Sequence, residues 1–215
     1  MKDIIIVGAG GFGRELLQWI KDINLKKKTW NIKGFIDDNI KALDEIECDY
    51  KIISTIQDYY PKENDVFALA IAAPAIKEKV VGILKSRGCA FATVIHPTAI
   101  LGEFNCLGEG VIMYPKSEIT VNAKIGDFVS VLSCNIGHDV LVGDYATISS
   151  WCDITGGVHI CKGAYLASGV KVVPGRTIGE YAYVSIGSVV MNNIKAGYKV
   201  LGYPARKFMQ KKQDG

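Results

Sequence analysis

The sequence predicts an α/β domain over residues 1–94, followed by a domain of stacked six-residue repeats over residues 95–215. Short β-branched runs alternate with amphipathic helical segments in the first half. From Ile95 onward apolar residues recur at every sixth position, so the period of the pattern changes at that residue. With 215 residues and 49% hydrophobic content, the chain can bury a substantial core, and its length allows two domains.

The first half is expected to form a small parallel sheet with flanking helices, because its strands and helices alternate. The first helix, residues 11–23, follows a glycine-rich loop and carries apolar residues at helical spacing. The second helix starts at Pro74 and runs to Ser86, shortly before Gly88. The predicted strands are residues 4–7, 32–37, 66–72 and 90–95.

The second half contains seventeen apolar residues at six-residue spacing, seven from Ile95 to Val131 and ten from Ile136 to Val190. Most are followed by glycine or another small residue, which suits a tight turn. A six-residue unit with one inward side chain cannot bury its apolar side alone, so the units must stack. This pattern is typical of a parallel β-helix in which three hexapeptides form one triangular coil, and seventeen units predict between five and six coils.

The repeat contains one irregularity. Val131 and Ile136 are separated by five residues instead of six. A missing residue must distort one turn, and distorted turns in regular scaffolds are often functional. We therefore expect function close to this point, which directly precedes a histidine.

That histidine, His138, lies two positions after an inward isoleucine, with Asp139 beside it and Asp144 one hexapeptide further on. A carboxylate can fix the tautomer of a neutral imidazole and raise its basicity, as a general base requires. A surface histidine that caps a turn is the alternative, and spacing alone leaves both open. Of the other two histidines, His96 is expected at the domain junction, and His159 in a structural or rim position.

The glycine-rich loop, residues 8–13, matches the pattern G-x-G-x-x-G, and Asp37 lies 24 residues after Gly13. A dinucleotide such as NAD requires two mononucleotide-binding halves, and the six-residue period starts before a second half could be built. We expect a single nucleotide here, with the helix amides at Gly10, Gly11 and Phe12 receiving a phosphate.

Composition excludes several other classes. The six cysteines form no C-x-x-C pair, which predicts neither disulfides nor a metal site. The net charge of +3 comes from basic residues spread along the chain, apart from residues 26–28 and the tail, residues 206–212, which gives little support for nucleic-acid binding. The apolar run at the start is too short for a signal segment or a membrane span, so we expect a cytoplasmic protein without membrane insertion.

Several motifs occur in a characteristic order along almost the whole chain: GAGGFGRE at 8–15, GFIDDN at 34–39, the hexapeptides, IGHDVLVGD at 136–144, and GYPAR at 202–206. In this order the chain resembles the nucleotide-sugar N-acetyltransferases and sialic acid O-acetyltransferase-like proteins of the left-handed β-helix acyltransferases, typified by the bacillosamine-pathway enzyme. The left-handed winding rests on this resemblance, because the usual crossover rule is right-handed.

The resemblance implies a homotrimer that uses acetyl-CoA to acetylate the amino group of a nucleotide-linked sugar, expected to be a 4-amino-deoxy sugar, for surface glycan synthesis. It assigns His138 as general base, Asp139 as the acid that orients it, and the Gly156 amide as the donor that polarises the thioester carbonyl. Transfer from a thioester needs such a base and such a donor. No serine or cysteine nucleophile stands beside a histidine, so we expect direct attack in a ternary complex.

The resemblance also predicts the binding residues. Acetyl-CoA would lie between neighbouring subunits and contact Gly156, Ala167, Ser168, Ser185, Ile186, Gly187, Arg206 and Lys207. The nucleotide sugar would contact Gly8, Gly10, Gly11, Phe12, Gly13, Asp37, Asp38, Ala72 and Lys77.

The sequence departs from the family pattern at two places. Where relatives often have Ala-Ile-Gly followed by Asp or Asn and then an arginine, residues 70–77 read AIAAPAIK, and a second histidine found in some relatives is replaced by Thr147. Trp151 could shape the acyl or sugar pocket, or pack in the core or trimer. Two functional alternatives stay open at this point: O-acetylation of a sugar hydroxyl, and a catalytically silent β-helix that binds a nucleotide sugar.

Overall fold

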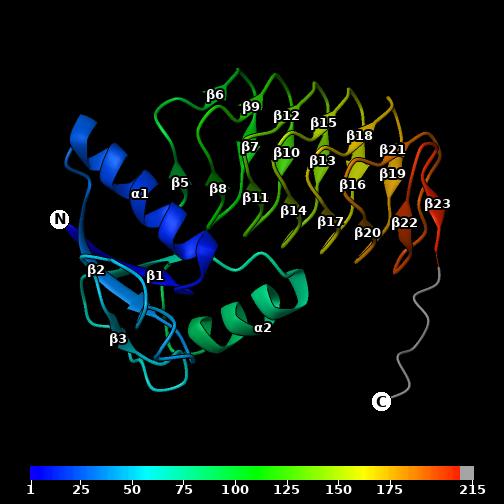
Figure 1. The fold of residues 1–215 in the computed structure, drawn as a ribbon. Helices are drawn as coiled ribbons and strands as arrows, with labels where there is room; N and C mark the ends of the chain where they lie inside the picture. The colour runs from blue at the N-terminus through cyan, green and yellow to red at the C-terminus, as the bar shows by residue number, and fades with distance from the viewer. Residues whose placement is uncertain (209–215) are drawn as a thin grey trace, which may run out of the picture.

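The computed structural model describes residues 1–208 and contains the two expected parts (Figure 1). The first part is a four-stranded parallel sheet in the order β3-β2-β1-β4. Its strands are β1 (Lys2–Val7), β2 (Trp30–Ile36), β3 (Ile52–Ser54) and β4 (Asp65–Leu69). The helices α1 (Gly11–Lys26) and α2 (Pro74–Lys85) cover opposite faces of this sheet, because alternate residues of β1 enter two separate core clusters.

Two details of the first domain differ from the sequence prediction. The strand β3 was not predicted, since only three residues pair there and one of them is exposed. The predicted strand at 90–95 is wrong as a single element: Phe91 forms one isolated bridge with Phe67, and only Val94–Ile95 form a strand, β5. Ala92, next to Phe91, is buried, but the pairing with β4 does not continue past the Phe91 bridge.

The second part is a parallel β-helix whose first seventeen strands end at the seventeen predicted apolar positions. Each of them has two residues, from β5 (Val94–Ile95) and β6 (Ile100–Leu101) to β21 (Val189–Val190). The strands between are β7 (Cys106–Leu107), β8 (Ile112–Met113), β9 (Glu118–Ile119), β10 (Lys124–Ile125), β11 (Ser130–Val131), β12 (Asn135–Ile136), β13 (Leu141–Val142), β14 (Thr147–Ile148), β15 (Asp153–Ile154), β16 (His159–Ile160), β17 (Tyr165–Leu166), β18 (Lys171–Val172), β19 (Thr177–Ile178) and β20 (Tyr183–Val184).

These strands stack into three sheets, which form the three faces of a triangular prism. We call them face 1 (β5, β8, β11, β14, β17, β20), face 2 (β6, β9, β12, β15, β18, β21) and face 3 (β7, β10, β13, β16, β19). The strands β22 (Lys199–Leu201) and β23 (Arg206–Lys207) extend face 1, and β23 runs antiparallel. The turns from one face to the next form three corners, named 1–2, 2–3 and 3–1.

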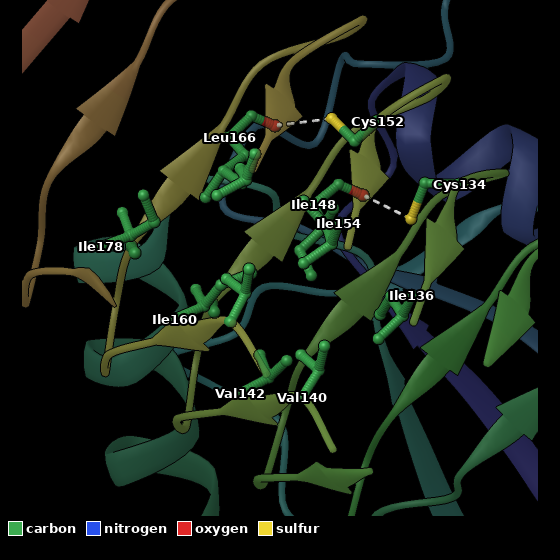
Figure 2. Close-up of a cluster of buried hydrophobic side chains, with 14 of the residues drawn as sticks. Cys134, Ile136, Val140, Val142, Ile148, Cys152, Ile154, Ile160, Leu166 and Ile178 are labelled. Carbon is green, nitrogen blue, oxygen red and sulfur yellow. Dashed lines mark hydrogen bonds between the residues drawn. The ribbon is translucent and has the colours of Figure 1, made fainter. Parts of the chain in front are cut away.

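The core of the prism is a single file of apolar side chains. Figure 2 shows Ile136, Ile154 and neighbouring residues directed into the interior from successive coils. Two buried cysteines, Cys134 and Cys152, lie beside this file with their Sγ atoms near the carbonyl oxygens of Ile148 and Leu166, at 3.9 and 4.0 Å. Most of the predicted inward residues are buried, whereas Leu101, in the first coil, is 41% exposed because β6 forms the edge of its sheet.

The N-terminal domain packs on the first coils of face 1 and leaves faces 2 and 3 uncovered by the rest of the described chain (Figure 1). On one side, Trp19 of α1 packs edge-on against His96. On the other side, Glu78 of α2 forms an ion pair of 2.6 Å with Lys162 at corner 3–1. No helix within residues 1–208 is long and apolar enough to cross a membrane. The predicted C-terminal tail extends beyond this range, and its residues 209–215 lie outside the described part.

Candidate active site

His138 and Asp139 lie at corner 2–3, in the turn between β12 and β13. The His138 Nδ1 atom is 2.7 Å from Asp139 Oδ2, and the two side chains are 65% and 55% exposed. Asp139 adopts a φ of 59°, a conformation that aspartate tolerates better than most residues. An ionised carboxylate accepts a hydrogen bond from Nδ1–H, which leaves the lone pair of the neutral imidazole on Nε2 as a potential base.

Asn122, one coil earlier at the same corner, donates a hydrogen bond from its side-chain amide to Asp139 Oδ1. The hydrogen bond from His138, followed by the one from Asn122, holds the pKa of Asp139 below its usual range. The carboxylate is thus ionised at neutral pH and has an acceptor site for each neighbour. The sequence analysis missed Asn122, although it precedes Asp139 by 17 residues, the length of that coil.

Gly156 lies in the next coil, directly beside the histidine. A Cβ atom at Gly156 would be 2.4 Å from His138 Nε2, so the imidazole edge lies against the glycine backbone. The carbonyl of His138 accepts from the amide of Gly157 at 2.9 Å, which ties the two turns together. The Gly156 amide itself has no hydrogen-bond partner among residues 1–208. A base and an unused backbone donor are therefore adjacent at the surface.

The residues predicted for acetyl-CoA form a second group. Ala167 and Ser168 follow β17, and Ser185, Ile186 and Gly187 follow β20, so all five lie at corner 1–2. The Gly187 amide donates to the Ser168 carbonyl at 2.9 Å, and Ile186 is 70% exposed. Within one chain this stripe is separated by face 2 from His138 and Gly156. Arg206 and Lys207 lie at the end of the prism in β23, both exposed, with Lys207 Nζ 4.0 Å from the Tyr198 ring centroid.

The glycine-rich loop follows β1 and opens onto the carboxyl end of the small sheet. A Cβ on Gly13 would lie 2.0 Å from the Gly8 carbonyl oxygen, which explains the need for glycine there. Gly10 caps α1 without a side-chain hydrogen bond, and no acidic residue lies in the first turn. The first amides of α1, at Gly11 and Phe12, can therefore receive an anion.

The acidic residues of the GFIDDN motif are also at this end of the sheet. Asp37 Oδ2 accepts from the Ala9 amide at 2.7 Å, and Asp38 Oδ1 accepts from the Ile56 amide at 2.9 Å. Asp37 thus lies against the glycine loop. Asp38 is fixed on the opposite side by the segment after β3.

The strand order reverses its direction across the sheet between β1 and β4, and at such a switch point we expect a ligand crevice beyond the strand ends. Residues 70–73, the β4–α2 loop, form its second wall, and a Cβ on Gly8 would touch the Ala70 carbonyl oxygen at 2.9 Å. A cavity of about 620 Å³ continues from this loop onto face 1, between Ala72 and the rings of Tyr165 and Tyr183. The predicted contact Ala72 therefore lines an open cavity.

Lys77 is a correction to the predicted binding residues. Its side chain is fully buried, with Nζ bound to four protein oxygen atoms between α2 and face 1. It cannot contact a substrate directly. Thr147, the position of the second histidine in some relatives, is one of its four partners.

A second cavity, of about 650 Å³, lies along corner 1–2 between α1 and the coils. It is lined by Trp19, His96, Ser133 and the exposed Trp151, among others. Ser133, at φ 52°, marks the turn that is one residue short, so this irregularity opens into the cavity and not toward His138 at the other end of β12. No sequence pattern predicted this cavity, because it depends on how α1 docks.

The two remaining histidines are not part of the His138 cluster. His96 is buried, with Nδ1 2.9 Å from Thr98 Oγ1 and Nε2 3.4 Å from Asp22 Oδ2, at the domain junction. His159 is exposed on β16, 4.0 Å from Cys161 Sγ.

Comparison with known proteins identifies relatives for the whole chain. The family described as "PglD N-terminal domain" matches residues 3–84. GDP-perosamine N-acetyltransferase of Escherichia coli O157:H7 is 30% identical over 212 residues, which are 94% of each chain. WeeI from Acinetobacter baumannii AYE is 28% identical with a TM-score of 0.85, covering 97% of this chain and 100% of that one. PerB from Caulobacter crescentus, solved with CoA and GDP-perosamine, is 21% identical with a TM-score of 0.84, covering 97% and 98%. The predicted fold, a half-Rossmann domain followed by a left-handed β-helix, is confirmed.

Proposed function

The chain belongs to the nucleotide-sugar N-acetyltransferase family, and we propose that it transfers the acetyl group of acetyl-CoA to the amino group of a nucleotide-linked, 4-amino-deoxy sugar for surface glycan synthesis. The observation that carries this proposal is the cluster at corner 2–3. There the imidazole of His138 lies beside Gly156, whose amide has no hydrogen-bond partner among residues 1–208, and Asp139 Oδ2 is 2.7 Å from His138 Nδ1.

In the proposed reaction the sugar amine attacks the thioester carbonyl carbon directly. His138 Nε2 removes the proton from the amine as the C–N bond forms, and Asp139 stabilises the resulting imidazolium. The Gly156 amide donates to the carbonyl oxygen as negative charge develops on it. The C–S bond then breaks, and the proton passes to the sulfur of CoA, which leaves as the thiol.

We propose that the complete site forms between two copies of the chain, in a homotrimer. His138 and Gly156 lie at corner 2–3, whereas the expected CoA residues lie at corner 1–2, on the other side of face 2. One elongated ligand contacts both groups if corner 2–3 of one subunit faces corner 1–2 of its neighbour. The cyclic arrangement of three prisms repeats this contact and closes.

The nucleotide of the acceptor is proposed to bind in the crevice between β1 and β4. Its phosphates would meet the amides at Gly10, Gly11 and Phe12, and its ribose or base would meet Asp37 or Asp38. This assignment is supported by the uncapped start of α1 and by the switch in strand order. E. coli GDP-perosamine N-acetyltransferase, which acts on a nucleotide-linked amino sugar by its name, supports the acceptor class.

The deciding experiment measures release of the CoA thiol from acetyl-CoA against UDP-, GDP- and dTDP-linked 4-amino and 3-amino sugars and their hydroxyl counterparts. His138→Ala is compared with wild type, and His159→Ala is the matched control, because it also removes an exposed histidine from the β-helix. Release with an amino sugar that is lost in His138→Ala and kept in His159→Ala supports the proposal. Release with hydroxyl sugars alone establishes O-acetylation, and background release with the whole panel favours a silent nucleotide-sugar-binding protein.

A further inference from the structure

Lys77 is a buried lysine without an acidic partner among residues 1–208. Its Nζ lies 2.9 Å from the Phe128 carbonyl oxygen, 3.0 Å from Ser130 Oγ, 3.0 Å from Thr147 Oγ1 and 3.2 Å from the Ala146 carbonyl oxygen. All four oxygen atoms are uncharged. Burying an amine among neutral groups is costly, and burial lowers the pKa of Lys77 to about 7. An apolar residue of similar size would avoid this cost, so the polar contacts themselves require an explanation.

The contact with Thr147 continues to the crevice. Thr147 Oγ1 also donates to the carbonyl oxygen of Ala72, at 2.8 Å. A hydroxyl has one proton, and this proton is used on Ala72, so Thr147 must accept from Lys77. The chain of hydrogen bonds therefore runs from α2 through face 1 and returns to the β4–α2 loop, residues 70–73.

Ala70 and Ile71 of the β4–α2 loop pack against the two core clusters of the first domain, but the loop has few other polar contacts. Its side chains, Ala70 to Ala73, are all apolar, and none of them can form a hydrogen bond. The Ala70 amide donates to the Val7 carbonyl oxygen at the end of the sheet, at 2.9 Å. The next backbone hydrogen bond is in the first turn of α2, where the Lys77 amide donates to the Ala73 carbonyl oxygen at 2.9 Å. Between these points, the Ala72 carbonyl bond to Thr147 connects the loop to the β-helix. Lys77 holds both ends of this connection: its Nζ donates to the Thr147 hydroxyl, and its backbone amide donates to the Ala73 carbonyl oxygen at the other end of the loop.

The loop borders the expected crevice between β1 and β4, and its residues Ala72 and Ala73 also line the cavity of about 620 Å³ on face 1. A shift of the loop changes the width of the crevice and of the cavity. It does not reach His138 and Gly156, because corner 2–3 lies on the opposite side of the prism from face 1. We propose that Lys77 is a positioning residue for the acceptor: through Thr147 it sets the β4–α2 loop at the spacing that admits the nucleotide sugar. This inference rests on the proposed function.

The test compares variants that break this chain at different points. Thr147→Val keeps the shape of the side chain and removes its hydroxyl, whereas Thr147→Ser restores the hydroxyl. Lys77→Met keeps most of the length of the side chain and removes its donors. Lys85→Met is the matched control, because Lys85 also joins α2 to the β-helix, through a 2.6 Å ion pair with Glu109, but at the far end of the helix from the loop.

The first readout is hydrogen exchange of the peptide spanning residues 70–77 in the full-length protein, which needs no substrate. We expect Lys77→Met and Thr147→Val to exchange about fivefold to tenfold faster than wild type, the change that loss of one net hydrogen bond permits. Thr147→Ser and Lys85→Met should exchange at the wild-type rate. Thermal unfolding of each variant identifies any that fail to fold. If Lys77→Met does not fold, the comparison of Thr147→Val with Thr147→Ser decides the result.

The second readout is steady-state kinetics. Lys77→Met and Thr147→Val should raise the KM for the nucleotide sugar by a similar factor and leave the KM for acetyl-CoA unchanged. Unchanged exchange, or an equal effect on both KM values, would overturn the positioning role even where acetyl transfer itself proceeds. Faster exchange in a protein that transfers no acetyl group would instead count against the proposed function and leave the role of Lys77 in holding the loop intact.

Discussion

Replacing Gly156 by alanine tests the geometry of the candidate site most directly. The new methyl group would lie 2.4 Å from both Nε2 and Cε1 of His138, about 1 Å inside an ordinary carbon contact. Because His138 is 65% exposed, its ring can swing outward at little cost in stability, but it then leaves its position beside Asp139 and the Gly156 amide. A displacement of about 1 Å in a catalytic group lowers the reaction rate roughly a hundredfold. We therefore expect kcat to fall about a hundredfold in Gly156→Ala.

The neighbouring glycine provides the control. A Cβ on Gly157 meets nothing within 4 Å, yet Gly157 has a φ of +67°, which alanine adopts only with strain. Gly157→Ala should therefore lose about 1 kcal/mol of stability and keep its kcat, whereas Gly156→Ala should keep its stability and lose its kcat. The assay is thiol release at saturating substrates together with thermal unfolding of both variants. A wild-type kcat in Gly156→Ala would refute the placement of the base against this glycine.

Three further results are expected. Asp139→Asn should lower kcat and leave both KM values unchanged in the thiol-release assay, because the amide cannot stabilise the charged imidazole as the carboxylate does; an unaltered kcat would remove Asp139 from the mechanism. The folded-state pKa of Lys77, about 7, lies below the ordinary value of 10.5, so between these values the unfolded chain holds more protons and the free energy of unfolding rises with pH. This contribution is at most about 1.4 kcal/mol per pH unit, and denaturant titrations of Lys77→Met should lack it; an identical slope in both proteins would contradict it. Finally, the variants His138→Ala and Ile186→Glu should each be inactive alone. Unfolding and refolding them together in equal amounts should recover about one quarter of wild-type activity, because about one quarter of the interfaces then join an intact corner 2–3, from an Ile186→Glu chain, to an intact corner 1–2, from a His138→Ala chain. A site contained in one chain would recover none.

The β-helix was predictable at the level of single residues, whereas the docking of the first domain was not. The six-residue period determines where each strand ends, because every coil imposes the same spacing on its inward side chain. The irregularity between Val131 and Ile136 was visible for the same reason. The period also places His138 and Gly156 at one corner, 18 residues apart, so their proximity follows once the coil length is known.

Lys77 shows why the rest could not be predicted. A lysine in the first turn of a helix is normally exposed, and nothing local indicates otherwise. Its burial depends on Ser130 and Thr147, which lie 53 and 70 residues away in sequence and become its partners only when α2 docks on face 1. The cavity along corner 1–2 depends in the same way on where Trp19 of α1 meets the coils.

In the proposed mechanism the three corners of the prism have different parts, and this division follows from the repeat itself. A coil of about 18 residues returns to the same corner in every turn, so substitutions at one phase of the repeat build a continuous stripe without disturbing the other two. Corner 3–1 holds α2 through Lys162 and Glu78, which fixes the acceptor domain on face 1. Corner 2–3 carries the proposed base, and corner 1–2 carries the stripe expected to bind CoA. These last two corners point away from each other, so a single chain separates the expected CoA stripe from the proposed base. If both assignments hold, the chemistry requires the prisms to associate, as in the proposed trimer.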